Sequence, residues 1–343
     1  MKIATSIGYW SAGPPDGAAE VFDAADRLQL DQVWTAEAYG SDAWTPLAWW
    51  GSRTSHVHLG TAVSQLSARP PATLAMAAMT MDHLTKGRVI VGIGTSNPQV
   101  VEGWYGQPYP RPLERTREYF DIVRAIIARA EPVAYDGRHY QLPFTGGTGL
   151  GKPLRSILHP YRTQIPLYLG AEGPKNVALA AEIADGWNVI FFSPKMNDFY
   201  ATALAEGFSR PGARHTSATF DVVAGPMSII VDDQLERAAD RLRPSLALYI
   251  GGMGARDVNF HHEVFARLGY EGQARTIQDL YLAGDKKAAI AAVPTQLVED
   301  VALIGPWAKI VDEIQLWKET VLTTFSIGSD LRLMDKIVEL LRA

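Results

Sequence analysis

The strongest constraint in the sequence is a repeated alternation between short apolar segments and longer amphipathic ones. The short segments, such as 88–94, are apolar at nearly every position and lack the polar alternation of a half-exposed strand. Continuous apolar strands are typical of a parallel sheet, because helices cover both of its faces. The longer segments, such as 114–130, carry apolar residues at helical spacing. The pattern therefore predicts an α/β fold with parallel strands.

The alternation repeats about eight times, which limits the choice of α/β architecture. We expect strands at 2–8, 32–36, 57–63, 88–94, 165–170, 186–191, 220–225 and 320–326. The segment 229–231 either extends the seventh strand or forms a new one after it. This number of units in 343 residues favours a closed (β/α)8 TIM barrel that spans residues 1–343 as one domain. A doubly wound sheet is the alternative fold.

Two segments do not fit the alternation. Residues 132–160 are rich in glycine and proline, and residues 247–294 form a longer stretch that we expect to be helical in pieces. Long connections in a compact domain are usually functional. Active sites of barrels lie at the carboxyl ends of the strands. We therefore expect both segments to be insertions that cover this catalytic face.

The composition excludes several classes of protein. The chain has no cysteine, which excludes disulfides, thiolate catalysis and cysteine-ligated metals. A net charge of −5 gives no electrostatic reason to bind nucleic acid, and no apolar window is long enough for a membrane span. The amino terminus opens as a strand and not as a signal peptide, which predicts a cytoplasmic protein. His261 and His262 lack a third ligand at helical spacing, so no metal site is expected.

Glu37 directly follows the expected strand 32–36, with Tyr39 two residues later. A carboxylate at the carboxyl end of a barrel strand can hydrogen-bond a cofactor or act as an acid or base. We therefore expect Glu37 and Tyr39 to be catalytic residues. The alternative for Glu37 is a helix cap or a loop ion pair.

Two further strand ends carry residues suited to a bound ligand. After strand 165–170, the glycines allow close backbone approach, and the start of the next helix presents free N–H groups to an anion. The residues of this expected binding loop are Gly170, Ala171, Glu172, Gly173, Pro174 and Lys175. After strand 88–94, Ser96 and Asn97 could contact the edge of a cofactor ring. A tight turn in the first case, and an Asx or Ser/Thr turn in the second, are the alternatives without function.

Taken together, these motifs resemble the luciferase-like monooxygenase superfamily, in particular its coenzyme F420-dependent branch, which is similar to methylenetetrahydromethanopterin reductase. The segments that carry the resemblance are 33–37, 59–63, 92–98, 101–106, 166–174 and 184–187. Each motif is weak alone, but their order and spacing cover nearly the whole chain. The resemblance implies a barrel with a flavin or deazaflavin at its carboxyl face.

The resemblance also implies roles for individual residues. Thr61, Ala62 and Val63 match a bulge behind the cofactor ring, which commonly contains a non-proline cis peptide; by position this bond is Ala62–Val63. The segment from Gly170 to Lys175 matches the part that holds the phosphate end, and Glu37 matches an acidic residue near the ring. Many relatives have a histidine directly after this acid, whereas the chain has Ala38. Proton transfer is therefore expected to fall to Glu37 or Tyr39, or to need no protein acid there.

These features predict a coenzyme F420-dependent oxidoreductase that transfers a hydride to or from an unidentified small organic substrate. One alternative is an FMN-dependent luciferase-like monooxygenase, and a second is a non-catalytic protein that binds coenzyme F420. A hydrolase with paired carboxylates is disfavoured, because Glu172 is the one other carboxylate at a strand end. Family resemblance further implies a homodimer.

Overall fold

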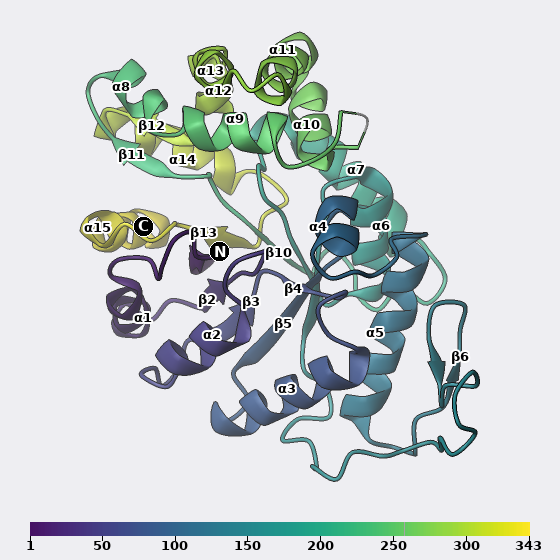
Figure 1. Ribbon diagram of the computed structural model, residues 1–343. Coiled ribbons are helices and arrows are strands. Elements are labelled where there is room, and N and C mark those ends of the chain that lie inside the picture. Colours follow the sequence, from purple (N-terminus) through teal and green to yellow (C-terminus); the bar gives the residue numbers. More distant parts are fainter. Residues whose placement is uncertain (257) are drawn as a thin grey trace.

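Parallel strands close into an eight-stranded barrel in the computed structural model, which describes residues 1–256 and 258–343 (Figure 1). The barrel strands are β1 (Lys2–Gly8), β2 (Gln32–Thr35), β3 (His58–Thr61), β5 (Val89–Gly94), β8 (Leu167–Gly170), β9 (Gly186–Asn188), β10 (Asp221–Ala224) and β13 (Thr324–Ser326). Pairing of β3 with β5 closes the ring, and the short strand β4 (Ser64–Gln65) continues β3 beside β5. The predicted (β/α)8 barrel is therefore confirmed.

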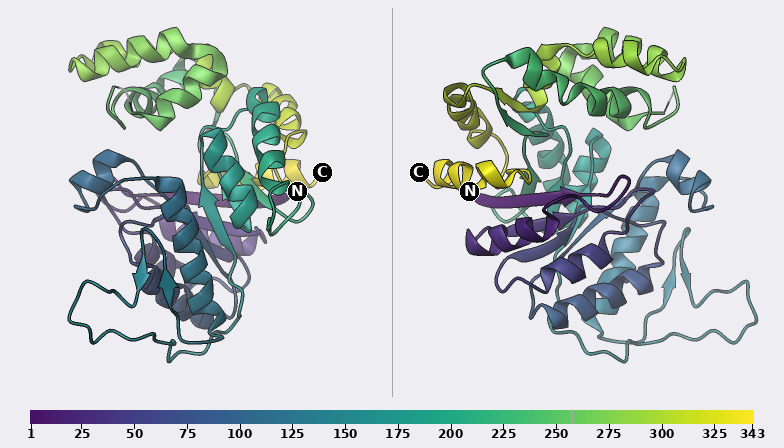
Figure 2. Two further views of the ribbon diagram at one scale, coloured as in Figure 1. Left: turned by 90° about the vertical axis from the view of Figure 1, so that its right-hand side faces the viewer. Right: turned by 60° about the vertical axis from the view of Figure 1, so that its left-hand side comes forward.

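Helices cover the outside of the barrel, as the alternation predicted (Figures 1 and 2). They are α1 (Ala18–Arg27), α2 (Trp44–Gly51), α3 (Pro71–Leu84), α4 (Pro98–Gly103), α5 (Pro112–Ala128), α6 (Pro174–Ile183), α7 (Asn197–Phe208), α14 (Trp307–Lys318) and α15 (Leu331–Arg342). Several begin with proline in the first turn, where its missing N–H has no intrahelical partner to lose. Among the helices of the described ranges, none has both the length and the hydropathy that crossing a membrane requires.

Several expected strands are shorter in the structure. The third ends at Thr61 and not at 63, the sixth ends at Asn188 and not at 191, and the eighth begins only at Thr324. The segment Ile229–Val231 does not extend β10. It forms β11, which pairs in parallel with β12 (Leu303–Gly305) in a separate small sheet.

A second layer of helices lies over the carboxyl ends of the barrel strands. This layer, which we call the roof, comprises α8 (Leu235–Asp240), α9 (Arg243–Gly251), α10 (Phe260–Phe265), a π-helical turn (Ala266–Tyr270), α11 (Glu271–Leu282), α12 (Lys286–Ala291) and α13 (Thr295–Val301) with β11 and β12 (Figures 1 and 2). The segment 247–294 belongs to it. The described residues of this segment lie over the carboxyl ends of the strands, and its description as an insertion into a single domain stays a prediction.

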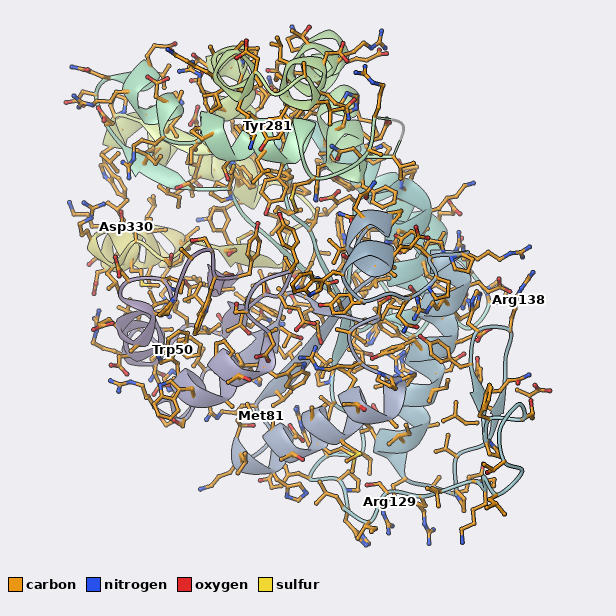
Figure 3. All side chains as sticks on the ribbon, in the orientation of Figure 1. Trp50, Met81, Arg129, Arg138, Tyr281 and Asp330 are labelled. Atoms are coloured by element: carbon orange, nitrogen blue, oxygen red, sulfur yellow. The ribbon has the colours of Figure 1, made fainter. Side chains whose placement is uncertain are left out.

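The segment 132–160 lies elsewhere, and here our expectation was wrong. Its hairpin of β6 (Tyr135–Asp136) and β7 (Gln141–Leu142) packs beside α5 (Figure 1). Arg129, which ends α5 just before the segment, lies at the opposite end of the molecule from Tyr281 in the roof (Figure 3). The physical reason is topological: α5 has already returned the chain to the amino-terminal end of the barrel before residue 132. The segment therefore cannot cover the carboxyl ends.

A buried polar cluster fills the amino-terminal end of the barrel interior. Asp221 accepts hydrogen bonds from the side chains of Gln32 (2.8 Å), Tyr168 (2.6 Å) and Thr324 (2.7 Å). Burial by itself favours the protonated acid, but hydrogen bonds from Thr323 and Tyr168 hold the pKa of Asp221 below its usual value. The amino-terminal end of a barrel mainly stabilises the fold, so this cluster is structural.

Glycines of β5 and β8 make room for the residues that interrupt the third strand. A Cβ at Gly92 would lie 1.9 Å from the carbonyl oxygen of Thr61, and one at Gly94 would lie 2.3 Å from Cγ2 of Val63. A Cβ at Gly170 would lie 2.8 Å from Cγ1 of Val63. The chain between β3 and β4 can therefore bulge against its neighbours only because these positions have no side chain.

This packing predicts that Gly94→Ala lowers the free energy of unfolding by about 1–3 kcal/mol, because the added methyl group overpacks the bulge. Urea unfolding measures the effect. Gly272→Ala is the matched control, since a Cβ there meets nothing within 4 Å and should be neutral or stabilising. Equal unfolding midpoints for the two variants would contradict the packing argument.

Candidate active site

A cavity of about 1210 Å³ opens between the carboxyl ends of the barrel strands and the roof. Barrel enzymes place their active sites at this face, and a large, mostly apolar pocket with a few convergent polar groups is the expected form of a ligand site. The roof contributes Tyr249, Met253, Phe260 and His261 to its wall. None of the residues 132–160 lines it.

Most of the residues predicted from the sequence come together on this wall. They are Glu37, Ala62, Val63, Ser96, Asn97, Gly170, Ala171, Glu172, Gly173, Pro174 and Lys175. Residues separated by more than a hundred positions in the chain are thus brought to one cavity by closure of the barrel. Two predicted residues, Thr61 and Tyr39, lie outside the lining.

Thr61 is fully buried, and its side chain joins two neighbouring strands of the barrel. Its hydroxyl donates to the carbonyl oxygen of Gly92 (2.8 Å) and accepts from the N–H of the same residue (3.1 Å). Both hydrogen-bonding functions of the hydroxyl are therefore used between β3 and β5. The Thr61 hydroxyl is therefore not available to a ligand, and contact of this residue with a cofactor stays a prediction without support from its position.

Tyr39 is 54% exposed, and its hydroxyl lies 4.0 Å from the sulfur of Met253 in the roof. A catalytic acid or base must come within hydrogen-bond reach of the reacting group. The expectation that Tyr39 handles a proton in the cavity therefore has no support from its position.

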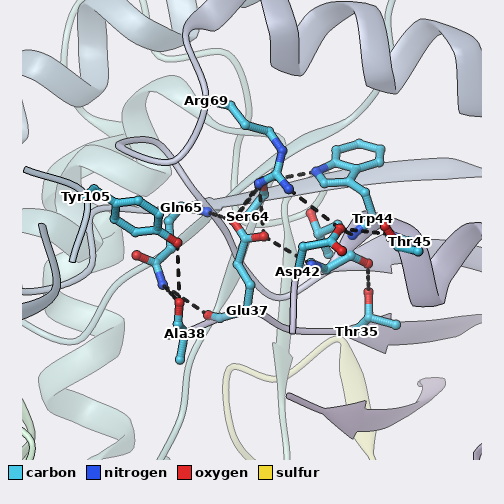
Figure 4. Close-up of polar contacts among 12 residues, drawn as sticks. Thr35, Glu37, Ala38, Asp42, Trp44, Thr45, Ser64, Gln65, Arg69 and Tyr105 are labelled. Atoms are coloured by element: carbon cyan, nitrogen blue, oxygen red, sulfur yellow. Dashed lines mark hydrogen bonds and ion pairs between the residues drawn. The ribbon is translucent and has the colours of Figure 1, made fainter. Parts of the chain in front are cut away.

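Glu37 borders the cavity, but its carboxylate is held by the protein (Figure 4). Arg69 reaches both carboxylate oxygens, at 2.7 and 2.9 Å. The backbone N–H groups of Gln65 (2.7 Å) and Ala43 (3.1 Å) donate to it as well. With the side chain of Glu37 only 3% exposed and that of Arg69 17% exposed, this is a buried, charge-assisted network.

The network fixes the loop after β2 to the strand that follows the bulge. The side-chain amide of Gln65 donates to the carbonyl oxygens of Glu37 and Ala38, each at 3.2 Å, and Tyr105 also donates to Ala38 (Figure 4). These contacts match the alternative of a loop ion pair for Glu37. They favour a positioning role over proton transfer, because the carboxylate oxygens are already engaged.

The peptide bond between Ala62 and Val63 is cis, as the resemblance implied, and both residues line the cavity. Val63 packs against the open faces of Gly94 and Gly170. The bulge therefore presents backbone and two small apolar side chains to the cavity. Such a surface suits the face of a flat ring.

Ser96 and Asn97 follow β5 and differ in what they offer. The side chain of Asn97 caps α4 by accepting from the N–H of Val100 (2.9 Å) and donates to the carbonyl oxygen of Met253 (3.1 Å). Its polar atoms are therefore engaged by the protein. Ser96 has a positive φ of 57° and lines the cavity, which leaves it as the residue of this pair that can meet a ligand.

The loop from Gly170 to Lys175 leads from β8 into α6. No side chain caps α6 at Gly173, so N–H groups at the start of this ten-residue helix can receive an anion. A Cβ at Gly173 would meet nothing within 4 Å, which shows open space at this point. The geometry suits an anion, and binding of a phosphate group here stays a prediction.

Glu172 in this loop points to the roof. Its carboxylate accepts from Nδ1 of His261 at 2.8 Å, and His261 also packs edge-on against Phe191 and Tyr249. Burial opposes protonation of His261, but the neighbouring Glu172 carboxylate prevails and raises the pKa of this imidazole above its usual value. The pair is thus an ionic link between the barrel and the roof.

The sequence reasoning missed Asn188. Both polar atoms of its side-chain amide are buried without a hydrogen-bond partner, and the residue lines the cavity. Buried polar groups are normally satisfied, and two further lining residues also carry an unpartnered buried oxygen, Oδ1 of Asn176 and Oε1 of Gln65. Residues at the carboxyl ends of barrel strands build the active site, and this rule would have identified Asn188. The sequence, however, predicted that the strand continues to residue 191.

One group of metal-binding type occurs among the described residues, outside the cavity. It consists of Glu114, Glu118 and His139. The carboxylate of Glu118 already accepts three backbone N–H groups of residues 138–140 at 2.9–3.0 Å. It thereby anchors the hairpin to α5, which explains the cluster without an ion.

A closed barrel with a large cavity at its carboxyl face defines a (β/α)8 protein built to hold a sizeable ligand. A family model described as luciferase-like monooxygenase matches residues 3–324 of the chain. The protein therefore belongs to the luciferase-like monooxygenase family.

Curated relatives cover nearly the whole chain. A putative coenzyme F420-dependent oxidoreductase of Mycobacterium tuberculosis is 52% identical over 320 residues, which cover 93% of this chain and 92% of the relative. A 5,10-methylenetetrahydromethanopterin reductase of Archaeoglobus fulgidus is 24% identical over 307 residues, or 89% of this chain and 87% of that one.

Solved structures share the fold. The coenzyme F420-dependent tetrahydromethanopterin reductase of Methanopyrus kandleri aligns with a TM-score of 0.76 at 23% identity, over 99% of this chain and 97% of that one. An F420-dependent secondary alcohol dehydrogenase in complex with an F420–acetone adduct aligns with a TM-score of 0.76 at 18% identity, over the same shares of the two chains. At these identities the likeness establishes the barrel architecture.

The buried network predicts that Glu37→Gln lowers the free energy of unfolding by about 3 kcal/mol, because Arg69 loses the closer and more buried of its two charged partners and keeps only Asp42 at 3.6 Å. Urea unfolding at neutral pH measures this loss. Asp335→Asn removes the Arg27 pair, whose side chains are each 59% exposed, and should leave the midpoint nearly unchanged. A similar midpoint for both variants would argue against a positioning role for Glu37.

The Glu172–His261 pair predicts a pH effect. Since the folded-state pKa of His261 is raised, the pair contributes stability at pH values below the unfolded-state pKa and loses it as the pH rises through the folded-state pKa. Imidazole NMR should show His261 titrating above the ordinary range of about 6.5 in the wild-type protein. Glu172→Gln should move this titration to lower pH, and an unchanged titration would show that Glu172 is not its cause.

Proposed function

We propose that the protein is a coenzyme F420-dependent oxidoreductase that transfers a hydride between the deazaflavin and a small organic substrate. The observation that carries the proposal is the pairing, in one cavity, of the bulge at Ala62 and Val63 with the uncapped start of α6 at Gly173. The first offers a surface to a flat ring, and the second offers N–H groups to a phosphate. The 52% identical relative named for coenzyme F420 supports the same cofactor.

The residues on the wall fit such a cofactor. Ala62 and Val63 would lie behind the ring, and Ser96 and the unpartnered amide of Asn188 would face its polar edge. The loop from Gly170 to Lys175 would hold the phosphate end. A deazaflavin carries carbon in place of a ring nitrogen and supplies hydride transfer, while the protein supplies position and electrostatics.

The placement of the proton donor changes from the initial expectation. Glu37 is engaged by Arg69, Tyr39 lies outside the lining, and Ala38 has no acid–base group. The hydroxyls of Tyr9 and Tyr249 lie 2.9 Å apart on the cavity wall. We therefore propose this pair, rather than Glu37 or Tyr39, as the source of a proton for the substrate.

A cofactor titration tests the proposal. The purified protein is expected to bind coenzyme F420 at least about 10-fold more tightly than FMN, measured by quenching of cofactor fluorescence. Asn188→Ala should weaken coenzyme F420 binding by about 10-fold, since one well-placed hydrogen bond in a buried site is worth about 1.4 kcal/mol. Thermal melting of the variant checks that the fold is intact.

Other outcomes of this titration would favour the alternatives. Preference for FMN, with oxygen consumption in the presence of reduced FMN, would replace the proposal by a monooxygenase. Tight binding of coenzyme F420 without turnover of any substrate would favour a non-catalytic binding protein. The cytoplasmic location and the homodimer remain predictions; sedimentation analysis would test the second.

A further inference from the structure

The cavity has a second half that the proposed cofactor does not use. The proposed cofactor residues follow β3, β5, β8 and β9, whereas β1, β13 and β10 lie side by side across the barrel. Residues after these three strands also line the cavity. This half, which we call the far arm, extends between α15 and the roof strand β11, where Asp330 is labelled in Figure 3.

Eight apolar side chains line the far arm, together with Ser228, Ser326, Ser329 and Asp330. The apolar residues are Ile7, Val223, Met227, Ile229, Ile230, Ile327, Leu333 and Ile337. The apolar side chains come from the strand ends, from the connection between β10 and β11, from β11 itself and from one face of α15. A hydrocarbon group placed among them leaves water for an apolar surface, which is favourable and non-directional.

One cation on the wall of the far arm is free to meet an anion. Arg241 lines the cavity and makes no ion pair with any residue of the described ranges. The positive charge of Arg241 helps to lower the pKa of Asp232 and of Asp330, but each acid is paired with another arginine: Asp232 with Arg237 at 2.7 Å and Asp330 with Arg332 at 2.6 Å. Asp330 also caps α15 through the N–H of Arg332.

The volume leaves room for a second molecule. Pockets for a single drug-sized ligand usually measure about 300–1,000 Å³, and this cavity of about 1210 Å³ is larger. A cofactor on the wall of β3, β5 and β8 would therefore leave the far arm open for a substrate that lies against it.

We propose that the far arm binds the substrate, and that the substrate is an amphipathic molecule with an extended hydrocarbon body and an anionic end group. The body lies among Ile229, Ile230 and Leu333, and the anion meets Arg241. This inference rests on the proposed function in one respect: the reacting carbon of the substrate faces the wall of β3, β5, β8 and β9, where the cofactor is proposed to bind. Binding in the far arm can be measured without any cofactor.

Displacement of a fluorescent probe tests the apolar part. The protein is loaded with 1-anilinonaphthalene-8-sulfonate, which combines an aromatic body with a sulfonate, and dodecanoate is titrated against it. Leu333→Trp is expected to weaken dodecanoate binding by at least 10-fold, because the indole fills the far arm. Leu331→Trp on the same helix is the matched control, since Leu331 is 36% exposed and outside the lining.

Ser228→Trp fills the far arm from the opposite side and guards against misfolding of the first variant. Weakened binding in both cavity variants, with Leu331→Trp unchanged, supports the proposal. Unchanged binding in folded Leu333→Trp and Ser228→Trp proteins, or no displacement by dodecanoate in the wild type, overturns it.

A second comparison tests the anionic part. Wild-type protein should bind dodecanoate at least 10-fold more tightly than dodecan-1-ol, and Arg241→Gln should abolish this difference. Arg275→Gln is the control, because the side chain of Arg275 is exposed on α11 and lies outside the cavity. This variant should keep the difference between acid and alcohol. Equal binding of acid and alcohol by the wild type overturns the anionic end group. Loss of coenzyme F420 binding with intact dodecanoate binding would instead defeat the proposed function and leave the far arm standing.

Discussion

The architecture of the site depends on how the third barrel strand is interrupted. Between Thr61 and Ser64 the chain leaves the sheet and bulges toward β5, where glycines replace side chains. The Thr61 hydroxyl fixes one side of the bulge to Gly92. The Glu37 carboxylate, held by Arg69, fixes the other side through the N–H of Gln65. The surface that we propose to lie behind the cofactor ring thus rests on buried polar contacts within the protein.

The order of strands around the barrel divides the cavity into two chemically different walls. The wall of β3, β5, β8 and β9 offers glycines, backbone N–H groups and an unpartnered amide at Asn188. The wall of β1, β13 and β10 offers aliphatic side chains and Arg241. The roof closes both and is tied to the first wall by the Glu172–His261 pair and by Asn97. One cavity can therefore hold two molecules of different polarity next to each other.

Much of the fold and part of the site could be predicted from local patterns. Apolar periodicity located the barrel strands, and the glycine-proline turn before α6 marked the loop that we propose to bind an anion. The sequence-based predictions failed where they depended on the exact end of a strand, on the end of the barrel that a segment covers, or on the direction of a side chain. Placing the end of the sixth strand at 191 concealed Asn188, and the segment 132–160 was assigned to the wrong end of the barrel. Neither the exact strand end nor the direction of Thr61 has a signature in apolar periodicity.

The sequence by itself determined the class of fold, the family and the residues that follow the strands, because periodicity and short motifs are local properties of the chain. Only the tertiary structure decided what each residue does. The sequence predicts a catalytic role for Glu37, but in the folded protein Arg69 pairs with its carboxylate. The sequence assigns Ser96 and Asn97 the same role, but in the folded protein Asn97 donates a hydrogen bond to Met253 in the roof. Contacts between residues distant in the chain use up hydrogen-bonding capacity, and among the described residues they leave the Asn188 amide without a hydrogen-bond partner and Arg241 without an ion-pair partner.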